Sequence, residues 1–406
     1  MGAVSARWLV TSSLGLFCVN AFGQALMPSS GSGGLVRIYG TDSAVLEARE
    51  PRKDLPCSVV PVKPFLGFDL KFHAGYEISI PLKELSGSED LLTIIFRVTP
   101  AGSDRTAYFS QKISVPAIEE DAKGNAFLQG NFDVGEGKYQ VDLLIRDRAE
   151  RVCSDYWESE AVLPAKDKDL NMVIAPSAIQ ASDKEPFKEE PPIDRDKETK
   201  PFNVKVLINF APQNSNAASM QPTDTNALVS ILRNIAREPK IGSFSLVAFN
   251  MQEQKVLYRQ DTADQIDFPS LGDAVDKMKL GVVDVRKLSE KNAETLFLTD
   301  LITRELTGKE RPDAVIFAGP KVMLDQPVPE DTLRQLGAPE YPVFYMNYNF
   351  NPQANPWRDA IGNAVKFFKG QEFTISRPRD LWFAWTEIMS RIVRTKGGRH
   401  DTASHD

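Results

Sequence analysis

The sequence predicts two domains of different classes, an all-β sandwich followed by an α/β domain with a doubly wound, mostly parallel sheet. Between residues 56 and 163, short runs of alternating apolar and polar residues are bounded by Gly, Ser, Asp or Pro, which is typical of a sandwich. In residues 202–394, apolar strand-like runs alternate with segments of helical period, which indicates a doubly wound sheet. The stretch between them, 164–201, is Pro-rich and densely charged and predicts an extended linker.

Composition places the chain among ordinary globular proteins and argues against one class of partner. Its 406 residues are 42% hydrophobic and 25% charged, which suits two domains with cores of their own. The formal net charge is -7, whereas a general nucleic-acid binder usually carries a basic face. We therefore expect no nucleic-acid partner.

The first residues have the pattern of an export signal. Arg7 precedes an apolar run that ends in Ala21-Phe22-Gly23, which predicts a signal peptide over residues 1–23 and a mature chain that begins at Gln24. Residues 24–55 are rich in Gly and Ser at first and then polar, and predict a flexible segment. No later run approaches the roughly 20 apolar residues of a membrane span. The expected product is an exported protein without an integral membrane segment.

Two cysteines, Cys57 and Cys153, remain after removal of the signal peptide. Export to an oxidising compartment favours a disulfide between them. Two buried free thiols are the alternative.

The first domain contains six strand-like runs followed by a strand that starts at Val152. The runs are 65–72, 76–82, 91–98, 106–115, 126–132 and 138–147. The segment from Gly135, with its G-x-Y-x-V pattern at Tyr139, resembles the last hairpin of immunoglobulin-like sandwiches. That resemblance implies an immunoglobulin-like domain over 56–163.

The second domain begins with the buried strand Val204–Ile208. Thr223 or Asp224 can cap the helix that follows and ends near Pro239. Further strands are expected at 243–250, 255–258, 314–318, 343–348 and 372–375, with helices at 289–308, 357–368 and 380–393. Residues 395–406 are polar and predict a disordered tail.

This order of elements resembles the von Willebrand factor type A fold, over roughly 202–394. The resemblance implies a metal-dependent adhesion site built from D-x-S-x-S after the first strand, a later Thr and an Asp after the central strand. Here Asn209 stands at the first Asp and both serines are missing, while Ala318-Gly319 stands where Asp-Gly is expected. Thr295 and Thr299, which could imitate the Thr, lie within a helical pattern. Because Mg²⁺ prefers anionic oxygen ligands, the sequence predicts the fold without a functional metal site and without a cofactor.

The loops at the carboxyl ends of the strands are the expected site, because ligands of open α/β sheets bind there. The candidate binding residues are polar and follow the first strand and the strand at 343–348; they are Asn209, Gln213, Asn214, Ser215, Tyr348, Asn349, Asn351 and Asn355. The sequence has no P-loop, no G-x-S-x-G and no His outside the tail other than His73. We therefore expect a protein-binding or scaffolding module that is not an enzyme.

Two alternatives remain open at this point. One is a metal-dependent adhesion domain with unorthodox ligands such as Asn209, Ser215, Asp224 and Asp300. The other is a hydrolase that acts on glycans through carboxylates at the sheet rim.

Overall fold

The computed structural model of the chain forms two compact units. One comprises residues 1–65, 72–162 and 174–182, and the other 66–71, 163–173 and 183–406. The structure describes residues 25–27, 38–87, 89–103, 105–183, 185–195, 201–214, 217, 220–278, 292–308, 311–324, 326–353, 355–356 and 358–403. The expected signal peptide at 1–23 lies outside the described residues. No helix in the described ranges has the length and apolarity that crossing a membrane requires.

The first unit is built from two antiparallel sheets, in agreement with the β-rich domain expected from the sequence. One sheet has the strand order β1-β5-β4-β7-β8 and the other β2-β3-β6-β9. The strands are β1 (Ala25–Leu26), β2 (Ser58–Leu66), β3 (Phe72–Pro81), β4 (Asp90–Pro100), β5 (Ala107–Val115), β6 (Asn125–Val134), β7 (Gly137–Arg146), β8 (Val152–Ala161) and β9 (Ile179–Ala181).

Aromatic side chains fill the core of this unit. Phe96 of β4 stacks on Phe109 of β5 with ring centroids 4.7 Å apart, and it also contacts Tyr76 of β3 and Phe132 of β6. All four rings are 1% exposed or less. Strands of both sheets therefore share one apolar core.

A disulfide joins Cys57, just before β2, to Cys153 in β8, with the two Cα atoms 6.3 Å apart. The bond closes a separation of 96 residues. In the chain-entropy model a loop of this length stabilises the native state by on the order of 4 to 5 kcal/mol.

The prediction of a flexible segment over 24–55 is wrong for its second half. Residues Gly40–Ala48 form helix α1, which contributes Val45 and Leu46 to a small cluster with Leu144 of β7. Leu46 is fully buried. Because polar residues dominate this segment, its composition did not indicate a helix. Its few apolar residues are nevertheless enough to pack one short helix against a sheet.

The second unit contains one six-stranded sheet with the order β12-β11-β10-β13-β14-β15. Its pairs are parallel except for β11 with β12. The strands are β10 (Phe202–Asn209), β11 (Ile241–Asn250), β12 (Lys255–Ala263), β13 (Ala314–Pro320), β14 (Val343–Tyr348) and β15 (Gln371–Ile375). The helices are α2 (Pro222–Ala236), α3 (Phe268–Val275), α5 (Ala293–Leu306), α6 (Glu330–Leu336), α7 (Ala360–Phe367) and α8 (Pro378–Ala403). The mostly parallel α/β sheet expected from the sequence is thus present; the short helices α3 and α6, with too few turns to show a period, were not expected.

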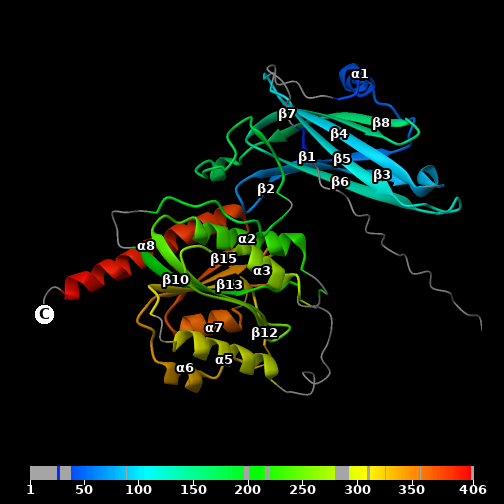
Figure 1. Ribbon diagram of the computed structural model, residues 1–406. Coiled ribbons are helices and arrows are strands. Elements are labelled where there is room, and N and C mark those ends of the chain that lie inside the picture. Colours follow the sequence, from blue (N-terminus) through cyan, green and yellow to red (C-terminus); the bar gives the residue numbers. More distant parts are fainter. Residues whose placement is uncertain are drawn as a thin grey trace, which may run out of the picture. The chain divides into compact units, whose positions relative to one another are not determined.

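Helices cover both faces of this sheet (Figure 1). Figure 1 shows α2, α3 and α8 on one face and α5, α6 and α7 on the other, in line with two separate apolar clusters. Alternation along β10 explains the division, because Val206 faces α2 and α8 while Leu207 faces α5 and α7. Lys205 lies on the same side as Leu207 and pairs with Glu305 of α5 at 2.8 Å.

The expected boundaries fail in the linker and at the tail. Within 164–201, strand β9 pairs with β6, and Phe187 packs against the core of the second unit. Glu190 forms ion pairs with Arg233 of α2 and with Arg237, the C-cap of that helix, at 2.8 and 2.7 Å. Specific partners therefore hold a segment whose dense charges predicted a solvated linker. Helix α8 continues to Ala403, past the expected helix end at residue 393 and into the tail that was expected to be disordered.

Candidate functional site

The carboxyl ends of β10, β13 and β14 surround a pocket of about 230 Å³. Strand β10 leads through α2 to β11 on one side, while β13 flanks it on the other, so the strand order reverses between β10 and β13. Such a switch point is where open α/β sheets hold their ligands. The pocket is lined by Asn209, Ala211, Pro212, Gln213, Met251, Gln252, Glu294, Pro320, Lys321, Val322, Met323, Tyr348, Asn349 and Asn355.

Asn209 ends strand β10 at the base of this pocket and is fully buried. Its Oδ1 accepts a hydrogen bond from the Met251 backbone N–H at 3.1 Å. Its Nδ2 finds no acceptor among the described residues. Gly319 lies against it with φ 148°, and a Cβ at that position would stand 2.7 Å from the Asn209 Cβ. Glycine is therefore required where β13 passes Asn209.

A network of amides ties the loop after β10 to the loop after β14. Gln213 donates from Nε2 to Asn349 Oδ1 at 3.3 Å and accepts from the Phe350 N–H at 3.1 Å. Asn349 donates in turn from Nδ2 to the Asn355 carbonyl at 3.2 Å. These side chains satisfy one another, and they fix the wall of the pocket before any ligand arrives.

Tyr348 stabilises the loop after β10, which forms part of the pocket lining. Its hydroxyl donates to the Ala211 carbonyl at 2.7 Å, and the ring is fully buried. Burial raises the pKa of Tyr348, and the charge of nearby Asp224 raises it further. Burial also raises the pKa of Asp224, although hydrogen bonds from the Gln213 and Gln221 N–H groups oppose the shift. Gln221, rather than the expected Thr223 or Asp224, is the N-cap of α2, with Asp224 completing a capping box.

Asp359, which was not among the residues expected from the sequence, fixes the part of the pocket lining at Val322. Its Oδ2 accepts from the Val322 N–H at 3.0 Å and from the Tyr345 hydroxyl at 2.7 Å, and its Oδ1 accepts from the Gly362 N–H at 2.6 Å. Burial raises the pKa of Asp359 to about 6, even though all three hydrogen bonds lower it. The signal available in the sequence was an Asp directly before an apolar helix, which is a common N-cap.

Five of the eight expected binding residues line the pocket, namely Asn209, Gln213, Tyr348, Asn349 and Asn355. Asn214 and Asn351 are exposed and lie outside its lining, and Ser215 lies outside the described residues. Five further lining residues could not be recognised from the sequence, because segments far apart in the chain bring them to this edge; they are Met251, Gln252, Glu294, Lys321 and Met323.

The described residues at this pocket do not fit a divalent metal. Asp224 uses its carboxylate on backbone N–H groups, and Asp300 is an exposed residue of α5 that pairs with Arg304 at 2.9 Å. Neither lines the pocket, and Thr295 donates its hydroxyl to the Gln326 carbonyl at 2.8 Å. Glu294 is the one carboxylate among the described lining residues, whereas glycoside hydrolysis uses a pair.

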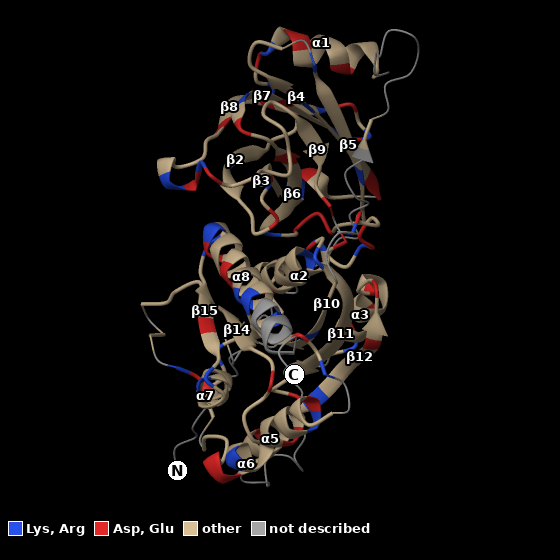
Figure 2. Ribbon diagram, turned by 90° about the vertical axis from the view of Figure 1, so that its left-hand side faces the viewer, with Lys and Arg blue, Asp and Glu red and all other residues tan. Residues whose placement is uncertain are grey.

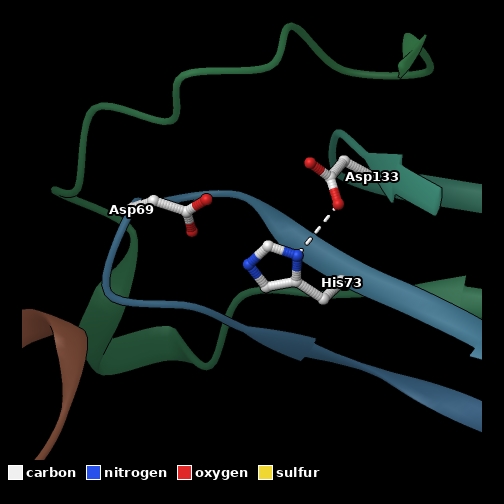
Figure 3. A group of neighbouring side chains, drawn as sticks. All are labelled: Asp69, His73 and Asp133. Carbon is white, nitrogen blue, oxygen red and sulfur yellow. Dashed lines mark hydrogen bonds and ion pairs between the residues drawn. The ribbon is translucent and has the colours of Figure 1, made fainter. Parts of the chain in front are cut away.

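His73, the histidine outside the tail, has a structural partner in the first unit (Figure 3). Its Nδ1 lies 2.9 Å from Oδ1 of Asp133 on the neighbouring strand β6, and Asp133 also accepts from the Ser182 hydroxyl. Asp133 is 1% exposed. The pair therefore gives Oδ1 of a buried carboxylate a partner; Asp69, also drawn, belongs to the second unit.

A second hollow of about 200 Å³ lies beside basic residues of α8, the helix whose Lys and Arg positions are blue in Figure 2. Arg391 pairs with Glu387 at 2.7 Å, and Arg394 donates to the Ser390 hydroxyl at 2.7 Å. Both guanidinium groups are thus engaged by side chains one turn away on their own helix, which leaves the pocket at the strand ends as the stronger candidate.

Comparisons with known proteins give no family for the chain. No protein-family model and no curated protein matches it. Among solved structures, a glycosyl hydrolase family 2 member from Bacteroides cellulosilyticus is 10% identical over 78% of this chain, with a TM-score of 0.19. The PilB minor pilin from Streptococcus sanguinis is 8% identical over 74% of this chain and 87% of its own, with a TM-score of 0.26. The chain spans 37% of the length of the glycosyl hydrolase. At such TM-scores neither likeness bears on the site.

Proposed function

We propose that the protein is an exported, non-enzymatic interaction module that binds a protein partner through the pocket between β10, β13 and β14. The observation that carries the proposal is the pocket itself, which stands at the switch point of the sheet and has a wall of preformed amide hydrogen bonds. A preformed wall lowers the entropy that binding must overcome. Charged groups capable of nucleophilic or acid–base chemistry contribute little to it, because the described lining holds one carboxylate and one ammonium.

Finer assignments of the two folds belong to the same proposal. We assign the second unit to a type A-like domain, since its strand order places an antiparallel edge strand, β12, beyond β11 and the first strand, β10, near the centre. We assign the first to an immunoglobulin-like sandwich, since Tyr139 donates its hydroxyl to the Gly135 carbonyl at 2.8 Å, as the corner tyrosine of such sandwiches does. The disulfide supports export to an oxidising compartment.

Partner capture by rim variants tests this function. The purified mature chain is incubated with an extract of the cell envelope, and captured proteins are compared for wild type, the rim variants Gln213→Ala and Asn355→Ala, and Gln335→Ala. Gln335 is an exposed amide on α6 outside the pocket lining and serves as the matched control. We expect the rim variants to lose a partner that wild type and control retain. Equal capture by all four proteins would refute the assignment of the surface.

Thermal unfolding separates this proposal from the metal-dependent alternative. An ion at a hundredfold excess over its dissociation constant stabilises the binding unit by about 2.7 kcal/mol. Because the Asp224 carboxylate is committed to backbone donors, we expect equal transition temperatures in EDTA and in millimolar Mg²⁺, Mn²⁺ or Ca²⁺. A rise with any of these ions would favour the adhesion site with unorthodox ligands.

A further inference from the structure

The side-chain amide of Asn209 is a buried donor without an acceptor. Asn209 is fully buried, and its Oδ1 is fixed by the Met251 N–H, so the assignment of nitrogen and oxygen follows from that hydrogen bond. Nδ2 has no acceptor among the described residues. A buried donor left unpaired costs free energy, and native proteins keep few of them. Asn209 also lines the pocket.

The other polar side chains of the wall are already engaged. Gln213 and Asn349 bond to each other and to backbone groups, and Lys321 donates from Nζ to the Asn355 carbonyl at 3.0 Å. Within the described lining, Asn209 therefore has the unmet hydrogen bond. The partner that its Nδ2 requires is an acceptor oxygen.

The charges of the lining favour a neutral acceptor. Lys321 and Glu294 both border the pocket and carry opposite charges, and Met251, Val322 and Met323 make part of the lining apolar. A carboxylate entering this pocket would lose its hydration without meeting a net positive charge, which is costly. An amide carbonyl loses less hydration on entry.

The size of the pocket points to a single side chain. Its volume of about 230 Å³ lies below the roughly 300 to 1,000 Å³ of pockets that hold whole small-molecule ligands. A side chain can reach the buried Asn209, whereas a backbone carbonyl brings its flanking residues with it.

We propose that this pocket receives the uncharged carboxamide of a Gln or Asn side chain of the partner, with Asn209 Nδ2 donating to its carbonyl oxygen. The inference rests on the proposed function and names the group that is recognised. Glu294 and Gln252 border the same space. Binding would thus give the buried amide of the protein an acceptor.

A titration with two small probes tests the proposal. Propionamide and propionate have the same size and differ in whether the terminal group is an amide or a carboxylate. The ¹⁵N-labelled mature chain is titrated with each at neutral pH, and the side-chain NH₂ signals of Asn209 are followed by NMR. These signals are identified by their absence in Asn209→Asp, or, if that variant does not fold, through their proximity to the Met251 amide proton.

We expect propionamide to shift the Asn209 signals and to bind at least about tenfold more tightly than propionate, a difference of about 1.4 kcal/mol. Gln335→Ala, outside the lining, should give the wild-type titration. Preference for propionate, or Asn209 signals that respond to neither probe, would overturn the proposal. If propionamide binds at Asn209 while rim variants still capture the partner, the carboxamide site stands and the proposed function fails. If rim variants lose the partner while Asn209 ignores propionamide, the reverse holds.

Discussion

Replacing Asp359 by Asn should change how stability depends on pH more than it changes stability at neutral pH. The carboxylate serves three buried donors, the Val322 N–H, the Tyr345 hydroxyl and the Gly362 N–H. An Asn side chain has one acceptor oxygen, so at least one of these donors faces an NH₂ group, at a cost of about 1 to 3 kcal/mol. Against this loss, the variant no longer holds an ionised carboxylate in a buried site.

The size of that relief follows from the pKa of Asp359, which burial raises from 3.8 to about 6. The difference corresponds to roughly 3 kcal/mol of preference for the neutral form in the native state. Because the native state holds the proton more tightly than the unfolded chain, this contribution is complete below about pH 4 and is lost as the pH rises to about 6. At pH 7 the two effects of the substitution nearly cancel, so the variant should lie within about 2 kcal/mol of wild type.

The assay is urea unfolding of wild type and Asp359→Asn between pH 4 and pH 7, with the transition of the second unit followed separately. Subtracting the variant from wild type removes the contributions of other groups, including Asp224, whose pKa burial also raises. We expect the difference to fall by roughly 3 kcal/mol, in favour of the variant, across this range. A difference that does not change with pH would refute the reasoning, because it would mean that Asp359 is ionised in the native state throughout.

Three further substitutions have definite expected outcomes. Gly319→Ala should destabilise the second unit by about 1 to 3 kcal/mol in urea unfolding, through strain and a clash, and more than Gly337→Ala, where φ is also positive but the space is open; equal losses would contradict the clash. Glu305→Ala leaves the buried Lys205 without its carboxylate partner and should cost about 3 to 5 kcal/mol, so a loss below about 1 kcal/mol would show that water reaches the ammonium. Replacing both disulfide cysteines by Ser should lower the stability of the first unit by about 2 to 5 kcal/mol in the same assay, and unchanged unfolding would show that packing alone holds the two strands.

Strands of the second unit could be predicted because local sequence determines them. Apart from Lys205, the run Val204–Ile208 is apolar on both faces of β10, as a strand covered by two helix layers requires. The N-cap of α2 is Gln221, whereas Thr223 or Asp224 was expected. Proline is suited to the first helical position, which Pro222 occupies, and the Asp224 carboxylate accepts a hydrogen bond from the Gln221 N–H.

Helix α1 and the ordered segment around Phe187 could not be predicted, because their order depends on partners far away in the chain. Helix α1 has polar surroundings in the sequence, and Leu46 becomes buried when it meets β7. Phe187 similarly stands alone among charges, yet it lies 5.9 Å from the ring of Phe210. Composition averages over such residues and therefore underestimates the order of the segments that contain them.

The position of the candidate site could be predicted, but its chemistry could not. Asn209 and Asn349 follow strands directly, so a parallel sheet brings them to one edge. Lys321 and Met251 arrive from loops after other strands, and nothing near them in the sequence marks them. The unpaired state of the Asn209 amide depends on the Met251 backbone and is visible in three dimensions alone.

The pairing of β9 with β6 decides where the chain can be divided for experiments. A fragment that ends at Leu163, the boundary that composition suggests, lacks β9 and leaves Phe132 to Val134 of β6 with unpaired N–H and C=O groups. Exposed strand edges of this kind recruit other chains into sheets and lead to aggregation. A fragment that extends to Ser182 retains β9 and also the hydroxyl that bonds to Asp133. The additional residues 164–182 thus separate a fragment in which this end of β6 is unpaired from one in which the short strand β9 covers it.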